Sequence, residues 1–207
     1  MLIMNFQQAE TVRDYNEVIE LNPKDAEAYF QRGYAYQLLE NTEKAIKDYN
    51  KVIELNPKYS DAYNNRGRAY DDSGKYEQAL NDFNQAIELN PKDAVAYNNR
   101  GIIYDNLGNH FQAIQDFDKA IDLDPKFAKA YYNRGLAYHS LENYEQAIND
   151  FNQATEWDTR YAKAYYHRGL AYIALGNNTK SIQDIKMAAW LGFTEAQDYL
   201  NSQGIEW

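Results

Sequence analysis

The chain has 207 residues, of which 44% are hydrophobic and 25% are charged, as in a soluble globular protein. Its formal net charge of -10 argues against a nucleic-acid partner, because a protein that neutralises phosphates needs a basic face. The chain has no cysteine, which excludes disulfides, thiolate metal ligands and a thiol nucleophile.

The N-terminus lacks the features of a targeting segment. The apolar start at Met1 turns polar at Asn5, without the basic region and the long apolar run of a secretory signal. No later stretch approaches the roughly 20 apolar residues of a membrane span. We therefore expect a soluble, cytoplasmic protein with no membrane partner.

Residues 1–25 are predicted to hold a half repeat, that is, only the second helix of a helix pair. In the segment 7–21, Val12, Tyr15 and Ile19 recur at helical spacing. No first helix precedes them to cover this apolar face, and an exposed apolar patch invites a partner. The pattern therefore suggests self-association into a homo-oligomer through these residues, unless the missing helix lies upstream in a longer protein.

The rest of the chain repeats with a period of 34 residues. The motif Ala-Tyr-x-x-Arg-Gly begins at Ala28, Ala62, Ala96, Ala130 and Ala164. A period of about 34 is associated with two helices per repeat. We expect five units, 26–59, 60–93, 94–127, 128–161 and 162–195, and then a C-terminal capping helix and tail over 194–207. Residues that recur at this step are said below to form a column.

Each unit is predicted to hold two amphipathic helices joined by a left-handed turn residue. Gly74, Gly108 and Gly176 occupy this turn in three units, and Glu40 and Glu142 replace glycine in the other two. Every unit also has a glycine inside its first helix, Gly67 in the second unit. A glycine there lowers the stability of the helix by about 1 kcal/mol relative to alanine. This recurrence indicates a close approach of the two helices. We expect the small alanines of the second helix, Ala79 in this unit, to face it.

These residues resemble the tetratricopeptide-repeat (TPR) family. In the unit 60–93 the matching residues are Tyr63, Gly67, Tyr70, Ala79, Phe83, Ala86 and Pro91. The resemblance implies an all-α fold, a right-handed superhelical α-solenoid of antiparallel helix pairs whose first helices line a concave groove. Arg66 and its column depart from the family, which usually has Leu there. This Asn-Arg-Gly variant is similar to a bacterial subtype.

The arginines recur together with a column of aspartates sixteen residues later. Arg32, Arg66, Arg100, Arg134 and Arg168 precede Asp48, Asp82, Asp116, Asp150 and Asp184. Because each cation comes with its own carboxylate, we predict an ion pair between helices, within a unit or between neighbouring units, and not an anion-binding site. Asp14 belongs to the aspartate column but has no arginine in its own half repeat, which leaves it to Arg32 or to another chain.

Asn65, Asn99 and Asn133, each just before an arginine, are candidate peptide-binding residues. In the TPR region of O-linked N-acetylglucosamine transferase, asparagines at the matching place hold an extended peptide by its backbone, and the resemblance implies the same here. A primary amide suits this task because it offers both a donor and an acceptor. The alternative is that they are solvated residues of a subtype consensus. The neighbouring candidates are Asn64, Asn98, Arg68, Tyr132, Tyr166 and His167, although tyrosines at helical spacing also suit packing against the next unit.

Nothing in the sequence points to catalysis. An active site brings together groups of different kinds, whereas almost every polar residue here recurs in register. His110 is interpreted as a core variant, and His139 and His167 lack a carboxylate at metal-ligand spacing. We therefore expect no enzyme, metal or cofactor, but a protein-protein interaction scaffold that binds an extended peptide or partner segment in the concave groove. The alternatives are a self-assembling scaffold and the TPR region of a larger protein.

Overall fold

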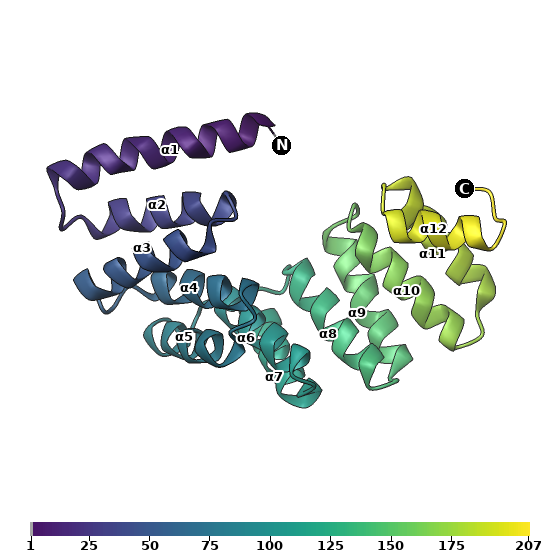
Figure 1. Cartoon of the computed structure of the whole chain (residues 1–207). Helices are drawn as coiled ribbons and strands as arrows, with labels where there is room; N and C mark the ends of the chain where they lie inside the picture. Colours follow the sequence, from purple (N-terminus) through teal and green to yellow (C-terminus); the bar gives the residue numbers. More distant parts are fainter. Residues whose placement is uncertain (1) are drawn as a thin grey trace. The chain divides into compact units, whose positions relative to one another are not determined.

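The structure is a computed structural model that describes the backbone of residues 2–207 and the side chains of residues 7–207. Over this range the chain forms twelve α-helices and no strand, as Figure 1 shows. The helices group into two compact units, Met1–Ile103 and Tyr104–Trp207. The predicted all-α class is therefore confirmed.

Two kinds of helix alternate along the chain. The first helices are α2 (Ala26–Leu38), α4 (Ser60–Asp72), α6 (Ala94–Asn106), α8 (Ala128–Ser140) and α10 (Ala162–Ala174). The second helices are α3 (Thr42–Leu55), α5 (Tyr76–Leu89), α7 (His110–Leu123), α9 (Tyr144–Trp157) and α11 (Asn178–Trp190). They are preceded by α1 (Leu2–Leu21) and followed by α12 (Thr194–Ser202).

The helices pack in chain order within each unit (Figure 1). In the N-terminal unit, α3 packs against both α2 and α4, and α1 packs against α2 in the same way. In the C-terminal unit, α9 packs against α8 and α10, and α11 packs against α10 and α12. A second helix thus joins its own first helix to the next one, which is the predicted stack of helix pairs.

Local sequence determines where these helices end. Asn56 follows α3 with extended backbone, φ -140° and ψ 88°, because the next residue is a proline and a residue before proline avoids the helical region. Its side-chain oxygen then accepts a hydrogen bond from the backbone N–H of Lys58 at 3.1 Å, which forms a turn. The Asn-Pro-Lys motif therefore both ends a second helix and directs the chain into the next first helix.

The turns inside the helix pairs adopt the left-handed conformation that the sequence predicts. Gly74 has φ +69°, which costs glycine little because it has no Cβ. Glu40 and Glu142 adopt φ 58° and 59° in the same place, at a cost of roughly 1–2 kcal/mol for a residue with a side chain. The close packing of the helices that follow holds them there.

In three first helices the inner glycine lies closest to an aromatic ring, and Gly169 lies closest to Ile185, so the nearest neighbour is not the predicted alanine. A Cβ added at Gly67 would lie 2.8 Å from Cε1 of Phe83, and one added at Gly135 would lie 2.7 Å from Cε1 of Phe151. These distances are too short for a carbon contact, and both rings are buried. Glycine therefore makes room for the ring of the second helix, and this close approach outweighs its cost in helix propensity.

Candidate functional site

Each of four arginines of the column donates to both carboxylate oxygens of an aspartate and to a third acceptor on the preceding second helix. Nε and Nη2 of Arg66 donate to the two carboxylate oxygens of Asp82 at 2.7 Å each, and Nη1 donates to Asn50 on the preceding second helix at 2.6 Å. The side chains of Arg66 and Asp82 are only 17% and 2% exposed. The same arrangement holds Arg32, Arg134 and Arg168 to Asp48, Asp150 and Asp184.

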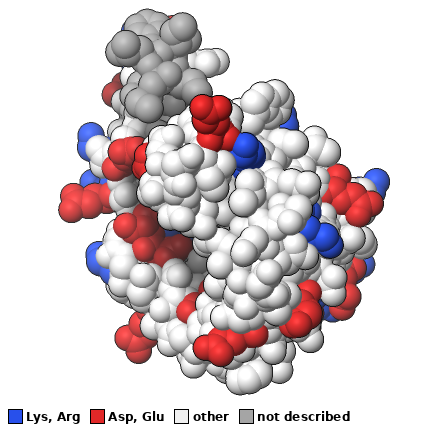
Figure 2. All heavy atoms as spheres, turned by 90° about the vertical axis from the view of Figure 1, so that its right-hand side faces the viewer, with Lys and Arg blue, Asp and Glu red and all other residues white. Residues whose placement is uncertain are grey.

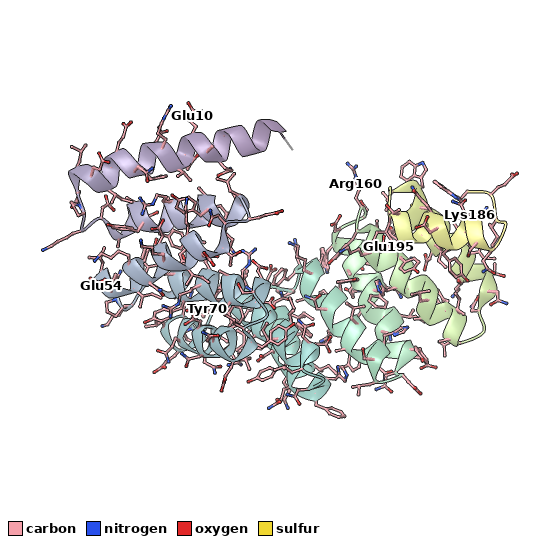
Figure 3. All side chains as sticks on the ribbon, viewed as in Figure 1. Glu10, Glu54, Tyr70, Arg160, Lys186 and Glu195 are labelled. Carbon is pink, nitrogen blue, oxygen red and sulfur yellow. The ribbon has the colours of Figure 1, made fainter. Side chains whose placement is uncertain are left out.

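Tyrosine rings flank the same guanidinium groups. The carbon atom of the Arg66 guanidinium lies 5.6 Å and 5.8 Å from the ring centroids of Tyr63 and Tyr70, the second of which is labelled in Figure 3. These distances allow a cation–π attraction. The predicted ion pair between helices is confirmed in these four units. The arginines serve packing, because Nε, Nη1 and Nη2 of Arg66 each already donate a hydrogen bond within the stack.

The column that supplies the third acceptor escaped the sequence analysis. It consists of Asn16, Asn50, Asn84, Asp118 and Asn152, which bind the arginines of the following units. The 34-residue period was the available signal, but it does not show which columns meet across an interface. Asp14 is exposed, and Arg32 binds Asn16 and Asp48 instead. The expected pair between Asp14 and Arg32 is therefore wrong.

In the N-terminal unit, a buried asparagine holds one member of the asparagine column by a hydrogen bond. Asn64 is 8% exposed, and its side-chain oxygen accepts a hydrogen bond from the Asn99 amide at 3.0 Å. This bond fixes the orientation of Asn99 and leaves its own carbonyl oxygen without a partner among the described residues. Asn65 is half-buried and has no hydrogen-bond partner within residues 7–207. Two amides are thus available to a ligand on this side of α4 and α6.

Several of the neighbouring candidates are buried. Asn64 and Asn98 are 8% and 4% exposed, and Tyr132 is 8% exposed, so these three do not face a groove as expected. Tyr132 packs its ring 4.8 Å from that of Tyr161, and burial raises the pKa of its hydroxyl to about 12. Its ring also lies 5.6 Å from that of His167, so at this position the tyrosine packs against the next unit, as in the alternative. Arg68 is exposed and forms no ion pair or hydrogen bond in the described part of the chain.

An unsatisfied amide lies beside Tyr49. The hydroxyl of Tyr49 donates to Oε1 of Gln37 at 3.1 Å, while Nε2 of Gln37 is buried with no partner within residues 7–207. A buried donor without an acceptor costs roughly 1–3 kcal/mol. Burial raises the pKa of Asp71, and the charge of Asp72 adds to the rise. The charge of Arg68 opposes it with a smaller effect. Arg68 is therefore the accessible donor beside Asp71 and Asp72, whereas Nε2 of Gln37 is buried.

In the C-terminal unit, His167 replaces the asparagine of the column and lies among aromatic rings. Its ring centroid is 5.6 Å from that of Tyr132, 6.2 Å from that of Phe151 and 5.4 Å from that of Tyr166. Nδ1 lies 2.9 Å from the carbonyl oxygen of Lys163, so this nitrogen carries the proton and donates. Burial lowers the pKa of His167 and outweighs the hydrogen bond to the Lys163 carbonyl, which raises it, and the charges of His139 and Lys163 add to the lowering. The neutral ring thus offers Nε2 as an acceptor.

The lowered pKa predicts a loss of stability in acid. The unfolded chain binds a proton on His167 near the ordinary pKa of 6.5, whereas the folded chain resists it until lower pH. The contribution to stability is therefore complete above about pH 6.5 and declines as the pH falls below it. Thermal unfolding at about pH 7.5 and about pH 5.5 should show a smaller drop in Tm for His167→Asn than for the unaltered chain. An equal drop in both would contradict this assignment.

The residues proposed for self-association only partly face solvent. Ile19 is 9% exposed and packs in the core, whereas Val12 and Tyr15 are half-buried. The exposed apolar side chains of the α1 segment with described side chains are Val18 and Leu21, at 39% and 89%. Ile19 therefore does not belong to a free surface, because the neighbouring first helix α2 already covers it.

The histidines and carboxylates form no metal site within residues 7–207. Nδ1 of His110 lies 2.6 Å from a carboxylate oxygen of Asp105, and both side chains are partly exposed, so His110 is not the core variant that was expected.

On the face drawn in Figure 2, Asp and Glu side chains line the lower edge and the middle is largely uncharged. Within residues 2–207 no helix is both long and apolar enough to cross a membrane.

Solved structures with the same fold include three proteins of similar length. PilW, a type IV pilus biogenesis factor, is 18% identical with a TM-score of 0.82, over 96% of this chain and 97% of that one. MamA is 25% identical with a TM-score of 0.69, over 80% and 96%. YrrB, a TPR protein with an unusual peptide-binding site, is 22% identical with a TM-score of 0.66, over 86% and 92%. No functionally curated protein matches the chain.

Family models match in sequence along most of the chain. Two models described as tetratricopeptide repeat match residues 26–59, 60–93 and 83–115. A third, described as TPR repeat, matches residues 7–40, 106–142 and 135–176. The adjacent matches 26–59 and 60–93 repeat with the 34-residue period of the sequence. The chain belongs to the tetratricopeptide-repeat family.

Proposed function

We propose that the chain is a protein-interaction scaffold that binds an extended peptide on the exposed side of its first helices. The observation that carries the proposal is the pair of amides on α4 and α6. The buried Asn64 holds Asn99 with a hydrogen bond of 3.0 Å, and Asn65 has no partner within residues 7–207. Amides held ready in this way suit a peptide backbone, which alternates donors and acceptors.

Asparagines alone do not provide a useful affinity. Each hydrogen bond contributes about 0.5–1.5 kcal/mol net, whereas micromolar binding needs about 8 kcal/mol. Side-chain contacts supply the rest. Arg68 is exposed and Tyr34 is 42% exposed, so the N-terminal unit offers a cationic donor and an aromatic surface. In the C-terminal unit, His167 and Tyr166 form a separate candidate contact with an acceptor and aromatic rings.

The comparisons support this proposal by analogy. The tetratricopeptide repeat is a fold of protein-interaction scaffolds, and YrrB, which has the same fold, is described as having a peptide-binding site. Because YrrB is only 22% identical, the likeness extends to the fold and not to particular ligands. The choice of site therefore rests on the amides themselves.

An array of extended peptides tests the proposal. The chain should retain a set of peptides, and Asn99→Ala should weaken each of them about three- to tenfold, because one or two backbone hydrogen bonds are lost. Asn64→Ala should weaken the same peptides, since Asn99 then loses its support. Asn81, which is exposed on the second helix α5, supplies the matched control Asn81→Ala, with no expected effect. Retention of every peptide by Asn99→Ala at full strength would refute the site.

A further inference from the structure

Within residues 7–207, no helix covers one face of α1, whereas the corresponding face of α3 is buried. The face consists of Thr11, Asp14, Tyr15 and Val18, which we call the open face. Asp14 is exposed, Val18 is 39% exposed, and Thr11 and Tyr15 are half-buried. Their column counterparts in α3 are Ala45, Asp48, Tyr49 and Val52, all between 0% and 3% exposed. Figure 1 shows α1 packed against α2 along one side only.

The rest of α1 packs as a complete second helix does. Asn16 accepts a hydrogen bond from Nη1 of Arg32 at 2.7 Å, just as Asn50 accepts one from Arg66 at 2.6 Å. Ile19 is buried at 9% exposure. Since these contacts reproduce those of α3, the orientation of α1 about its axis is the one seen in the complete units. The open face is therefore presented in the geometry that a first helix meets elsewhere.

The complete units show what such a face binds. On α3, Asp48 receives Nε and Nη2 of Arg32 at 2.8 Å and 2.7 Å. The ring of Tyr49 lies over Gly33, where an added Cβ would be 3.0 Å away from it. An arginine followed directly by a glycine thus satisfies the carboxylate and makes room for the ring. Asp14 and Tyr15 present the same carboxylate and the same ring.

We propose that the open face of α1 binds a helix of a partner protein that carries Arg-Gly, with a tyrosine three residues before the arginine. The guanidinium forms the bidentate pair with Asp14, and the glycine lies on the ring of Tyr15. The tyrosine flanks the guanidinium as Tyr29 flanks Arg32, at 5.4 Å. The partner helix extends the existing stack by one layer and uses contacts that are already built several times in this chain.

A second copy of this chain does not offer such a helix. The arginines that precede glycine are already engaged, because Arg32, Arg66, Arg134 and Arg168 form ion pairs in their own units and Arg100 donates to Asn84. The terminal helix α12 has Leu200 and Asn201 where the other first helices have arginine and glycine. The C-terminal tail also folds back on it, because Nε1 of Trp207 donates to Asn201 at 3.2 Å. We therefore assign the open face to a different protein.

A helical peptide with the sequence of residues 60–75 provides the probe. It carries Tyr63, Arg66 and Gly67, and a lactam bridge between exposed side chains holds it helical, since isolated helices of this length are marginal. Fluorescence anisotropy with the full-length chain should show saturable binding. Asp14→Ala in the chain, or Arg66→Ala in the peptide, should each weaken it by about tenfold or more, because either change breaks the charge-assisted pair. The two changes together should cost little more than one.

Glu20→Ala is the matched control, because it removes another exposed carboxylate of α1 outside the open face. Its counterpart in a complete unit, Glu54, projects from near the end of α3 (Figure 3). The control should change the affinity less than about twofold. Circular dichroism checks that each variant keeps its helices. This test is independent of the peptide array, which probes the asparagines of the first helices and not the open face of α1.

Three outcomes would overturn the proposal. The first is an absence of saturable binding by the helical peptide. The second is binding that Asp14→Ala leaves unchanged and Asn99→Ala abolishes, which would place the peptide on the first helices. The third is a dimer of the chain alone, seen by light scattering behind a sizing column, that Asp14→Ala dissociates. That result would assign the open face to a second copy.

Discussion

Replacing Arg66 by alanine is expected to lower the free energy of unfolding by about 3–5 kcal/mol. The change leaves Asp82, which is 1% exposed, as a buried carboxylate without its guanidinium, and it removes a donor from Asn50. Urea denaturation followed by circular dichroism, fitted with a nearest-neighbour treatment of the repeats, measures the loss. Because the arginine binds two second helices, the interface between two repeat units should weaken together with the helix pair.

Arg68 provides the control in the same helix. It is exposed and unpaired within residues 7–207, so Arg68→Ala should change the stability by no more than about 0.5 kcal/mol. The double variant Arg66→Leu with Asp82→Leu should recover much of the loss, since apolar residues often replace a buried ion pair at little cost. A loss below about 1 kcal/mol for Arg66→Ala would mean that the pair behaves as a surface salt bridge.

Phe151→Ala is expected to cost about 3–5 kcal/mol in the C-terminal unit. The ring is 0% exposed, lies against Gly135 and packs 5.9 Å from the ring of Tyr132. Its removal leaves a cavity that the rigid glycine face cannot fill. It also removes the neighbour of His167, whose ring centroid is 6.2 Å away, so peptide binding there should fall as well. Urea denaturation measures the stability, and the peptide array measures the binding.

Phe111 is the matched control, since it carries the same side chain on another second helix. It is 75% exposed and stands where Glu43, Glu77 and Glu145 occur in other units. Phe111→Ala should shift the stability by no more than about 0.5 kcal/mol. Equal losses for the two phenylalanines would show that the ring-on-glycine contact contributes nothing of its own.

The sequence predicted the elements well because each boundary has a local cause. The left-handed turns at Glu40 and Glu142 were expected from the column alone, although neither is glycine. The pairing of arginine with aspartate followed from their common period. Both inferences depend only on which residues recur together, and a 34-residue repeat displays this directly.

The contacts across helix interfaces were harder to predict. The period cannot distinguish Ala79 from Phe83 as the neighbour of Gly67, because both lie on the inner face of the second helix and only its rotation and approach decide. Asn64 and Asn65 are adjacent in sequence, yet one is buried and the other is half-buried. Successive residues of a helix are about 100° apart around its axis, and this step separates the buried Asn64 from the candidate contact Asn65. The sequence does not give the rotation of the helix about its axis to that precision.

The third acceptor of each arginine makes the array extensible. Arg66 needs Asn50 from the unit before it, and Asn84 of its own unit serves Arg100 in the next. The arginine of a unit thus uses an acceptor from the unit before it, and the same unit supplies an acceptor to the arginine of the next. Insertion or deletion of a whole 34-residue unit leaves each guanidinium with its full set of partners. A gain or loss of any other length breaks this succession, so the chemistry itself favours growth of such a chain by complete repeats.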